Sequence, residues 1–202
     1  MIETNPSSAT ILRLPPPEQT GKMSLEEALT RRRSVREFTP ESLTERELSQ
    51  LLWSAQGITH AQGLRAAPSA GALYPLEVYA ALPGGFCRYE PRLHYLVRLS
   101  DRDLRAEMRH SAWDQEFITQ APAVFVIVAI YERMSGKYGA ARTPRYVHME
   151  AGHAAQNLLL EAVALGLGGV PVGAFVDEGL RKAFHLPSDH HPLYLIPVGH
   201  PR

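Results

Sequence analysis

The sequence predicts an α+β protein in which helices flank a central, mostly antiparallel sheet. Helix-start signals open segments 24–32 and 45–56, and a nearly continuous apolar run at 122–130 is typical of a strand buried on both faces. A long segment rich in alanine and leucine, residues 146–165, predicts the longest helix. The 202 residues and the 45% hydrophobic content indicate one compact domain, expected over residues 23–202.

The first 22 residues differ in composition from the rest of the chain. They hold Pro6, Pro15, Pro16 and Pro17 and few side chains that a core would bury. Such a segment is expected to form an extended or disordered N-terminal arm. It has no apolar stretch of the kind found in secretory signal peptides.

Two capping boxes mark the first helices. Ser24 with Glu27 opens a helix that runs to about Arg32, and Thr44 with Glu47 opens a second helix that ends near Gln56. In each pair the hydroxyl and the carboxylate satisfy backbone N–H groups that the first turn leaves free.

The middle of the chain alternates between strand and helix patterns. Residues 76–82 predict a strand, and residues 86–89 and 93–99 predict a hairpin. A helix is expected over 101–110, capped by Ser100.

The second half contains the most buried elements. The strand at 122–130 is followed by a segment, 131–145, that we expect to be a polar loop. The helix at 146–165 is apolar almost all round, so its burial is expected to need a second subunit as well as the sheet. The remaining expected elements are a strand at 170–175, a helix at 178–184 and a strand at 193–198.

Charge and cysteine content restrict the class of protein. The chain has 21 basic and 21 acidic side chains, which argues against a broad nucleic-acid or anionic membrane surface. No segment approaches the length of a membrane span, and Cys87 is the only cysteine. These features predict a soluble, cytoplasmic protein that binds no nucleic acid and no membrane.

Arginines cluster at the end of the first predicted helix. Arg32, Arg33, Ser34 and Arg36 lie within five positions and offer several donors in a small space. Guanidinium groups match phosphate oxygens two at a time, so this cluster predicts a local phosphate-binding site. The alternative is a solvated basic face.

Two other patterns are rejected. The glycines at 166–173 superficially match a dinucleotide-binding loop, but that loop follows a strand and opens a helix, and here the order is reversed. The C-terminal histidines do not have the spacing of metal ligands, and no metal site is expected. These side chains are His185, Asp189, His190, His191 and His200.

Three segments together resemble the nitroreductase superfamily of flavin enzymes. They are Arg32 to Arg36, the Pro68-Ser69-Ala70-Gly71 segment, and residues 166–175. Segments 69–75 and 152–158 most resemble the azoline-oxidising (SagB-type) branch of that superfamily.

The resemblance implies an FMN-dependent oxidoreductase built as an intertwined homodimer, with flavin bound between the subunits. The first segment would hold the phosphate and ribityl chain, the second would reach the flavin from the other subunit, and the third would lie over the isoalloxazine ring. The cofactor-binding residues implied in this way are Arg32, Arg33, Ser34, Arg36, Pro68, Ser69, Ala70, Gly71, Val172, Gly173, Ala174 and Arg202.

Lys137 and Tyr138 resemble the lysine–tyrosine pair of the azoline oxidases. In that chemistry a hydride leaves the heterocycle for flavin N5 while a base removes a proton from the neighbouring carbon. Both residues are therefore candidate catalytic groups, although the same dipeptide also occurs on ordinary surface loops.

Two further functions stay open. The chain could be a nitro or quinone reductase that takes electrons from NAD(P)H. It could also be a flavin-binding accessory subunit without catalysis of its own. The substrate in each case is a small molecule or a modified peptide.

Overall fold

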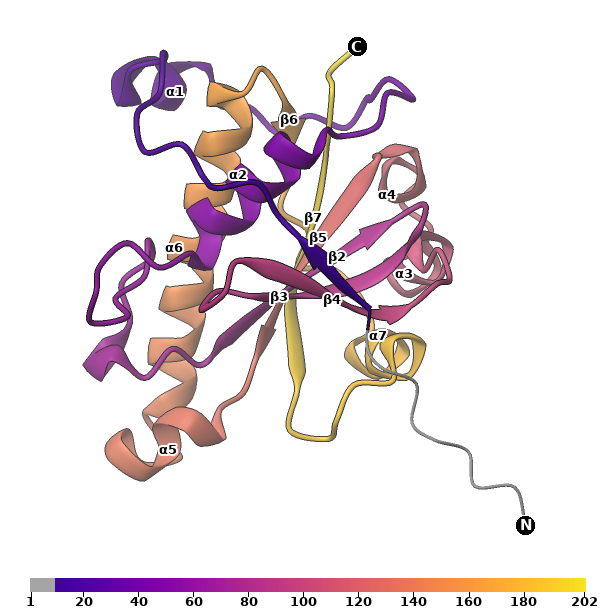
Figure 1. Ribbon diagram of the computed structural model, residues 1–202. Helices are drawn as coiled ribbons and strands as arrows, with labels where there is room; N and C mark the ends of the chain where they lie inside the picture. Colours follow the sequence, from indigo (N-terminus) through magenta and orange to yellow (C-terminus); the bar gives the residue numbers. More distant parts are fainter. Residues whose placement is uncertain (1–9) are drawn as a thin grey trace.

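The computed structural model describes residues 10–202 as a sheet between two layers of helices (Figure 1). Within these residues the sheet has 7 strands in the order β1-β4-β3-β2-β5-β7-β6, and the paired strands are antiparallel. The predicted antiparallel sheet with flanking helices is thus confirmed. Residues 1–9 of the expected N-terminal arm lie outside the described part.

The strands match most of the predicted ranges. They are β1 (Ile11–Arg13), β2 (Leu76–Leu82), β3 (Gly85–Glu90), β4 (Tyr95–Ser100), β5 (Ala123–Ala129), β6 (Gly168–Gly169) and β7 (His191–Gly199). All seven residues of β5 are buried, because helices cover both faces of the sheet. Phe125 and Ile127 point into one core, and Val124 and Val126 into the other.

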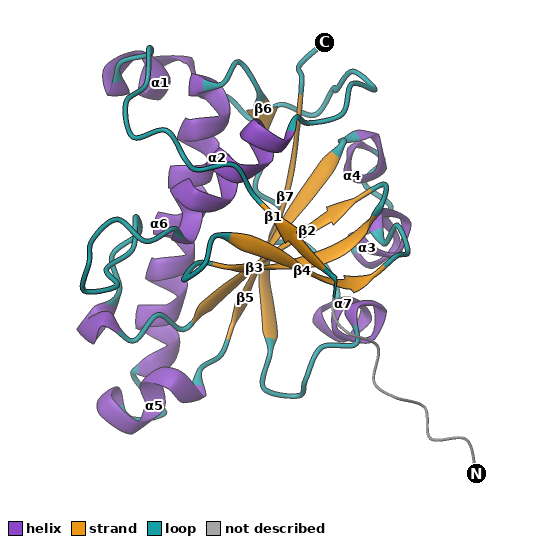
Figure 2. Cartoon of the chain, in the orientation of Figure 1, coloured by secondary structure: helices purple, strands orange, loops and turns teal. Residues whose placement is uncertain are grey.

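The helices divide between the two faces (Figure 2). One face carries α1 (Leu25–Arg31), α2 (Glu45–Gln56), α5 (Glu132–Tyr138) and α6 (Thr143–Ala164), together with the short turn η1 (Ala70–Ala72). The other carries α3 (Arg105–Ser111), α4 (Phe117–Gln120) and α7 (Asp177–Phe184).

The two predicted capping boxes differ in the structure. At α2 the box is complete, with Thr44 accepting from the backbone of Glu47 and the Glu47 carboxylate accepting from the backbone of Thr44. At α1 Ser24 accepts from the Glu27 N–H, whereas the Glu27 carboxylate pairs with Arg31 one turn later.

Three predicted elements differ from the structure in type, bounds or capping. Segment 131–145 is not a loop, because α5 occupies its first half and α6 begins at Thr143, with a proline in its first turn. The helix expected from 101 begins at Arg105, and the Ser100 hydroxyl accepts from the backbone of Arg102 instead of capping that helix.

The third such element is the strand over 170–175. Only Gly168–Gly169 forms a strand there, followed by a single bridge between Val172 and Leu195. The Val170 and Val172 N–H groups still donate to the Pro197 and Leu195 carbonyls of β7, so Pro171 is tolerated at this edge of the sheet, where its missing N–H would point away from β7.

The long helix α6 is buried on one side only in the single chain. Ala151, Ala154 and Leu158 pack into the core, whereas Met149 on the opposite side is 56% exposed. No helix among residues 10–202 is long and apolar enough to cross a membrane.

The described part of the N-terminal segment lies against the domain. Strand β1 pairs with β4 at the edge of the sheet, and the backbone of Glu18 exchanges hydrogen bonds with the Gln50 side chain at 2.9 Å in each direction. This segment is extended, and it also contributes a strand.

Candidate cofactor and active site

The arginine segment lies against the glycines that follow α6. Ser34 forms a parallel bridge with Gly169, and the Val35 N–H donates to the Gly169 carbonyl at 3.1 Å. A Cβ on Gly168 would lie 2.6 Å from Val35 Cγ2, so only glycine allows this close approach. The segment from Arg32 to Arg36 and the segment 166–175 are therefore neighbours in space.

The C-terminus joins the same region. The Arg202 N–H donates to the Glu37 carbonyl at 3.2 Å, and the Thr39 N–H donates to the His200 carbonyl at 2.9 Å. These bonds place the exposed Arg202 directly beside the arginine segment.

The arginines of this region have different surroundings. Arg33 Nη1 donates to the carbonyls of Thr30 and Arg32 at 2.9 and 2.7 Å, which satisfies acceptors at the end of α1. The Arg36 guanidinium lies 5.8 Å from the centre of the Phe117 ring. Within residues 10–202, no carboxylate lies in ion-pair distance of Arg32, Arg36 or Arg202, so these side chains can still receive an anion.

In the segment 172–174, Val172 is held by contacts within the chain, whereas the next two residues are exposed. Val172 is buried through its bridge to Leu195, and the Ala174 carbonyl accepts from Gln115 Nε2 at 3.4 Å. Gly173 and Ala174 are exposed, and a Cβ on Gly173 would meet nothing within 4 Å. Packing within the chain therefore does not require glycine at 173.

The second predicted segment is held by hydrogen bonds. The Ser69 hydroxyl accepts from the Tyr74 N–H at 2.9 Å, and Gly71 adopts a left-handed backbone with φ +64°. A Cβ on Gly71 would lie 2.6 Å from Lys137 Nζ and 3.1 Å from the Tyr138 hydroxyl oxygen. The structure therefore brings the two catalytic candidates together with this segment, while Pro68 beside it stays exposed.

Lys137 and Tyr138 lie in the last turn of α5, which ends at Gly139. Lys137 Nζ lies 5.7 Å from the centre of the Tyr138 ring, and that ring packs on Tyr146 of α6 with centroids 4.6 Å apart. The helical setting fixes the backbone of both candidates more firmly than the predicted loop would.

Glu150 is a site residue that the sequence reasoning missed. It lies on α6, is only 5% exposed, and accepts from the Ala70 N–H at 2.8 Å. Burial raises the pKa of this carboxyl, partly opposed by hydrogen bonds from Ala70 and Ser69. The available signal was a single acidic residue within an otherwise apolar helical face.

The predicted residues form two groups at opposite ends of α6. The arginine segment, which bridges Gly169 just after α6, and Arg202 lie near the C-terminal end of α6, and segment 68–71 with Lys137 and Tyr138 lies near its N-terminal half (Figure 1). Residues 172–174 continue from Gly169 along β7, where Val172 bridges Leu195. About 20 Å of helix separates Glu150 from the C-terminal end of α6, at 1.5 Å per residue. One chain therefore does not gather all the predicted residues around one small ligand.

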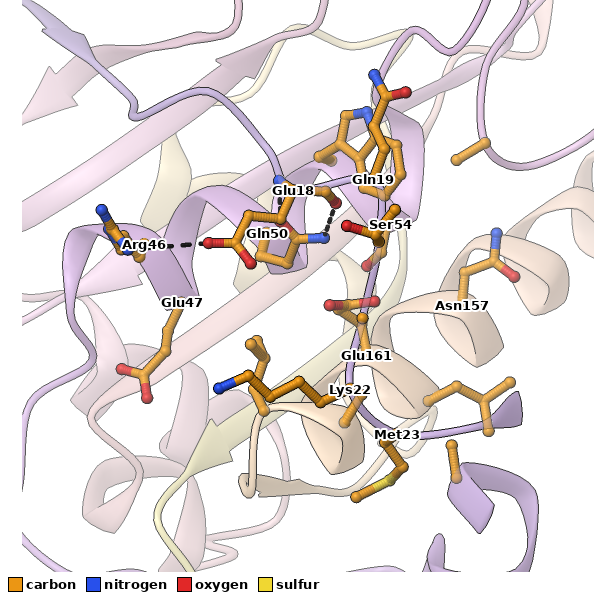
Figure 3. A pocket seen from close by; sticks show the side chains of 18 of the residues that line it. Glu18, Gln19, Lys22, Met23, Arg46, Glu47, Gln50, Ser54, Asn157 and Glu161 are labelled. Carbon is orange, nitrogen blue, oxygen red and sulfur yellow. Dashed lines mark hydrogen bonds and ion pairs between the residues drawn. The ribbon is translucent and has the colours of Figure 1, made fainter. Parts of the chain in front are cut away.

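The structure also has a cavity of about 980 Å³ (Figure 3). The N-terminal segment, α2 and the C-terminal half of α6 enclose it, and Gln50 and Glu161 face it with apolar neighbours. Burial raises the pKa of Glu161. None of the predicted site residues lines this cavity. Across residues 10–202 no group of three or more histidine, cysteine, aspartate or glutamate side chains is arranged to hold a metal.

Comparison with known proteins assigns the family. The model of the nitroreductase family matches residues 29–200, which includes every predicted site residue except Arg202. The chain belongs to the nitroreductase family. Its fold is accordingly nitroreductase-like, with an antiparallel sheet flanked by helices.

Individual nitroreductase relatives agree with this assignment. A protein from Methanocaldococcus jannaschii that carries the name nitroreductase is 45% identical over 184 residues, covering 88% of this chain and 91% of the relative. A solved structure from Ralstonia eutropha, also described as a nitroreductase, has a TM-score of 0.88 and 32% identity, covering 98% of this chain and 92% of its own. A Methanothermobacter thermautotrophicus protein named NADH dehydrogenase/NAD(P)H nitroreductase is 22% identical, covering 91% of this chain and 80% of the relative.

Proposed function

We propose that this chain is an FMN-dependent oxidoreductase that works as a homodimer. The observation that carries the proposal is the set of guanidinium groups without an ion pair, Arg32, Arg36 and Arg202, on a segment held against Gly169, a few residues before the exposed backbone at 173–174. A phosphate monoester requires such forked donors, and a flat ring requires backbone that it can approach closely. The residues present fit FMN.

The residues have separate tasks in this proposal. Arg32, Arg36 and Arg202 would hold the phosphate, and Ser34 would add a neutral donor. The exposed backbone of Gly173 and Ala174 would offer N–H groups to the ring. When bound, FMN supplies hydride-transfer chemistry. Preorganised donors near the ring favour the charge that develops during that transfer.

The separation of the two groups along α6 supports the proposed homodimer. A second copy that covers the outer face of α6 would bring segment 68–71 of one subunit to the arginine segment of the other. Exposed apolar side chains on that side support such a contact: Leu25 is 61%, Leu29 52% and Met149 56% exposed. These side chains lie on α1 and α6.

For the reaction, we propose electron transfer from NAD(P)H to a flat acceptor such as a nitroaromatic or a quinone. The support is the name of the Methanothermobacter relative, an NADH dehydrogenase/NAD(P)H nitroreductase. A second candidate, oxidation of a thiazoline or oxazoline ring to the azole, is favoured by the position of Lys137 and Tyr138 against Gly71. There the heterocycle loses a hydride to the flavin and a proton to one of these side chains. A third candidate is a flavin-binding accessory subunit without catalysis.

The first test is the visible absorption spectrum of the purified chain and identification of the released cofactor. We expect FMN at about one per subunit. The Arg32→Ala/Arg36→Ala variant should lose the flavin, because it lacks two charge-assisted forks. Arg31→Ala is the matched control, since Arg31 pairs with Glu27 and should leave flavin content unchanged. A wild-type protein that neither contains nor binds FMN would overturn the proposal.

A second test separates the reactions. Oxidation of NAD(P)H that accelerates with a nitroaromatic supports the reductase. Turnover of an azoline peptide that is lost in Lys137→Ala and Tyr138→Phe, with flavin retained, supports the azoline oxidase. If neither occurs and dithionite-reduced flavin is reoxidised only by air, the accessory role remains.

A further inference from the structure

A second cavity, of about 390 Å³, lies between the strands β2 and β3 and the turn that follows η1. Its lining includes four arginines and two glutamates. These side chains are Arg65, Arg88, Arg92, Arg133, Glu77 and Glu90. The cavity is therefore positively charged, although the whole chain is neutral.

Arg65 is the central cation of this cavity. Its guanidinium stacks at 4.5 Å on the Tyr74 ring, and its Nη1 donates to Gln56 Oε1 at 2.8 Å. Burial lowers the pKa of Arg65, and the nearby charge of Arg133 lowers it further. Within residues 10–202 no carboxylate lies in ion-pair distance of Arg65, and the charge of Glu90, which opposes the lowering of the Arg65 pKa, acts only from beyond that distance.

The carboxylate of Glu77, which lines the cavity, already has partners within the chain. Glu77 contacts the guanidinium groups of Arg133 and Arg88 and accepts from the Tyr79 hydroxyl at 3.0 Å. Burial alone would raise the pKa of Glu77, but the hydrogen bond and charge of Arg133, with Arg88, hold it below the usual value. Glu77 therefore has little capacity left to neutralise Arg65.

Other donors of the cavity are also free. Arg88 Nε is buried and has no hydrogen-bond partner among the described residues. Arg92 is exposed at the rim and forms no ion pair with them. Arg92 therefore offers an accessible guanidinium at the mouth of the cavity, whereas the buried Arg88 Nε is out of reach of a ligand there.

The cavity adjoins the group of residues around Lys137. Arg133 Nη1 donates to the Tyr74 carbonyl at 3.2 Å, and Arg133 lies one helical turn before Lys137 on α5. The cavity is distinct from the arginine segment 32–36, which lies toward the other end of α6.

We propose that this cavity is an anion-binding site that takes the carboxylate or phosphate group of a small ligand. Arg65 and Arg92 provide guanidinium donors to its oxygens. The volume is in the range of small-molecule sites and leaves room for a body beyond the acidic group. The proposal does not depend on flavin binding.

The test is isothermal titration of the full chain, saturated with FMN, using inorganic phosphate in one series and succinate in another. Binding should weaken about tenfold or more in Arg65→Gln, which loses a charge-assisted hydrogen bond. It should weaken several-fold in Arg92→Gln, and it should tighten in Glu90→Gln because the cavity becomes more positive. Arg46→Gln is the control, because Arg46 is 84% exposed and lies outside the cavity.

The two probes distinguish the source of the anion. If Arg65→Gln weakens the binding of phosphate alone, the natural ligand is a phosphate ester. If it weakens the binding of succinate alone, the natural ligand is a carboxylic acid. Should Arg65→Gln fail to fold, the opposite shifts of Arg92→Gln and Glu90→Gln decide, because neither residue holds a buried contact. The proposal is overturned if the wild type binds neither probe, or if all variants bind both probes as the wild type does.

Discussion

The carboxylate of Glu150 accepts a hydrogen bond from the backbone N–H of Ala70, 2.8 Å away and 80 positions distant in the sequence. This bond ties the segment around Gly71 to the middle of α6. It also explains why a single acid is tolerated in a helical face that otherwise packs into the core.

Replacing Glu150 by alanine should lower the free energy of unfolding by about 1–3 kcal/mol, because the Ala70 N–H loses its partner at a buried position. Glu150→Gln keeps an acceptor and should lose less. Urea unfolding of the two variants beside the wild type measures both effects. Equal losses in both variants would show that the hydrogen bond is not what Glu150 contributes.

The same residue has a pH signature. Its pKa is raised in the folded chain, so the folded state binds the proton more tightly than the unfolded state. The contribution of Glu150 to stability is therefore largest below the ordinary value of 4.5 and falls as the pH rises through the raised pKa. Glu150→Gln should remove this part of the pH dependence, as measured by urea unfolding between about pH 4 and pH 7.

Gly71→Ala should weaken FMN binding, an effect that the strain of the backbone alone does not explain. Alanine in a left-handed conformation costs about 1–2 kcal/mol, and the new Cβ would also displace Lys137 and Tyr138. Gly63→Ala is the matched control, because Gly63 has φ +81° and nothing within 4 Å of the Cβ position. We expect both variants to be destabilised similarly, with weakened FMN binding in Gly71→Ala only. Flavin fluorescence titration checks this, and equal affinities in the two variants would contradict it.

Elements with complete local signals could be predicted from the sequence to within a residue. Helix α2 has its full capping box, and β5 is an uninterrupted apolar run bounded by Pro122. Helix α5 could not be predicted, because its short sequence contains Gly136 and its first residue follows no capping side chain. The start of α3 was misplaced because Ser100 caps a turn instead.

The short segments of the candidate site could be predicted from the sequence, but the contacts between residues far apart in the sequence could not. The arginine cluster and the segment around Ser69 can be recognised because their residue types are close together in the sequence. The pairing of Ala70 with Glu150, and of Arg202 with Glu37, depends on how α6 and the C-terminal strand pack. Pattern periodicity carries no information on such contacts.

The His94 side chain should make the attachment of the N-terminal segment sensitive to pH. The Ser49 hydroxyl donates to the Pro15 carbonyl at 2.6 Å, and His94 Nε2 lies 2.7 Å from that hydroxyl, so Nε2 carries the hydrogen and Nδ1 accepts from Tyr89. Burial lowers the pKa of His94, partly opposed by the Pro15 carbonyl. The stability that neutral His94 provides is therefore complete above the ordinary value of 6.5 and is lost as the pH falls through the lowered pKa.

The measurement is the melting temperature at about pH 7.5 and about pH 5.5, on either side of the ordinary histidine pKa. The wild type should lose more stability on acidification than His94→Asn, in which asparagine tolerates the left-handed backbone at φ +50°. His110→Asn, at a side chain that is 88% exposed, serves as the control. A wild type and a His94→Asn variant with the same pH dependence would rule out this role.

Mixed dimers should reveal whether the two groups of site residues act across subunits. Arg32→Ala/Arg36→Ala removes the phosphate donors, and Pro68→Trp places a bulky ring at an exposed position of the other group. Each homodimer should bind little FMN. A mixed dimer of the two variants contains one pairing in which both groups are intact, and it should therefore recover about half of the wild-type flavin content if the site is shared. Differently tagged chains, refolded together and purified through both tags, allow this measurement. If each site belonged to one chain, neither half of the mixed dimer would be intact, and flavin content would stay at the level of the two homodimers.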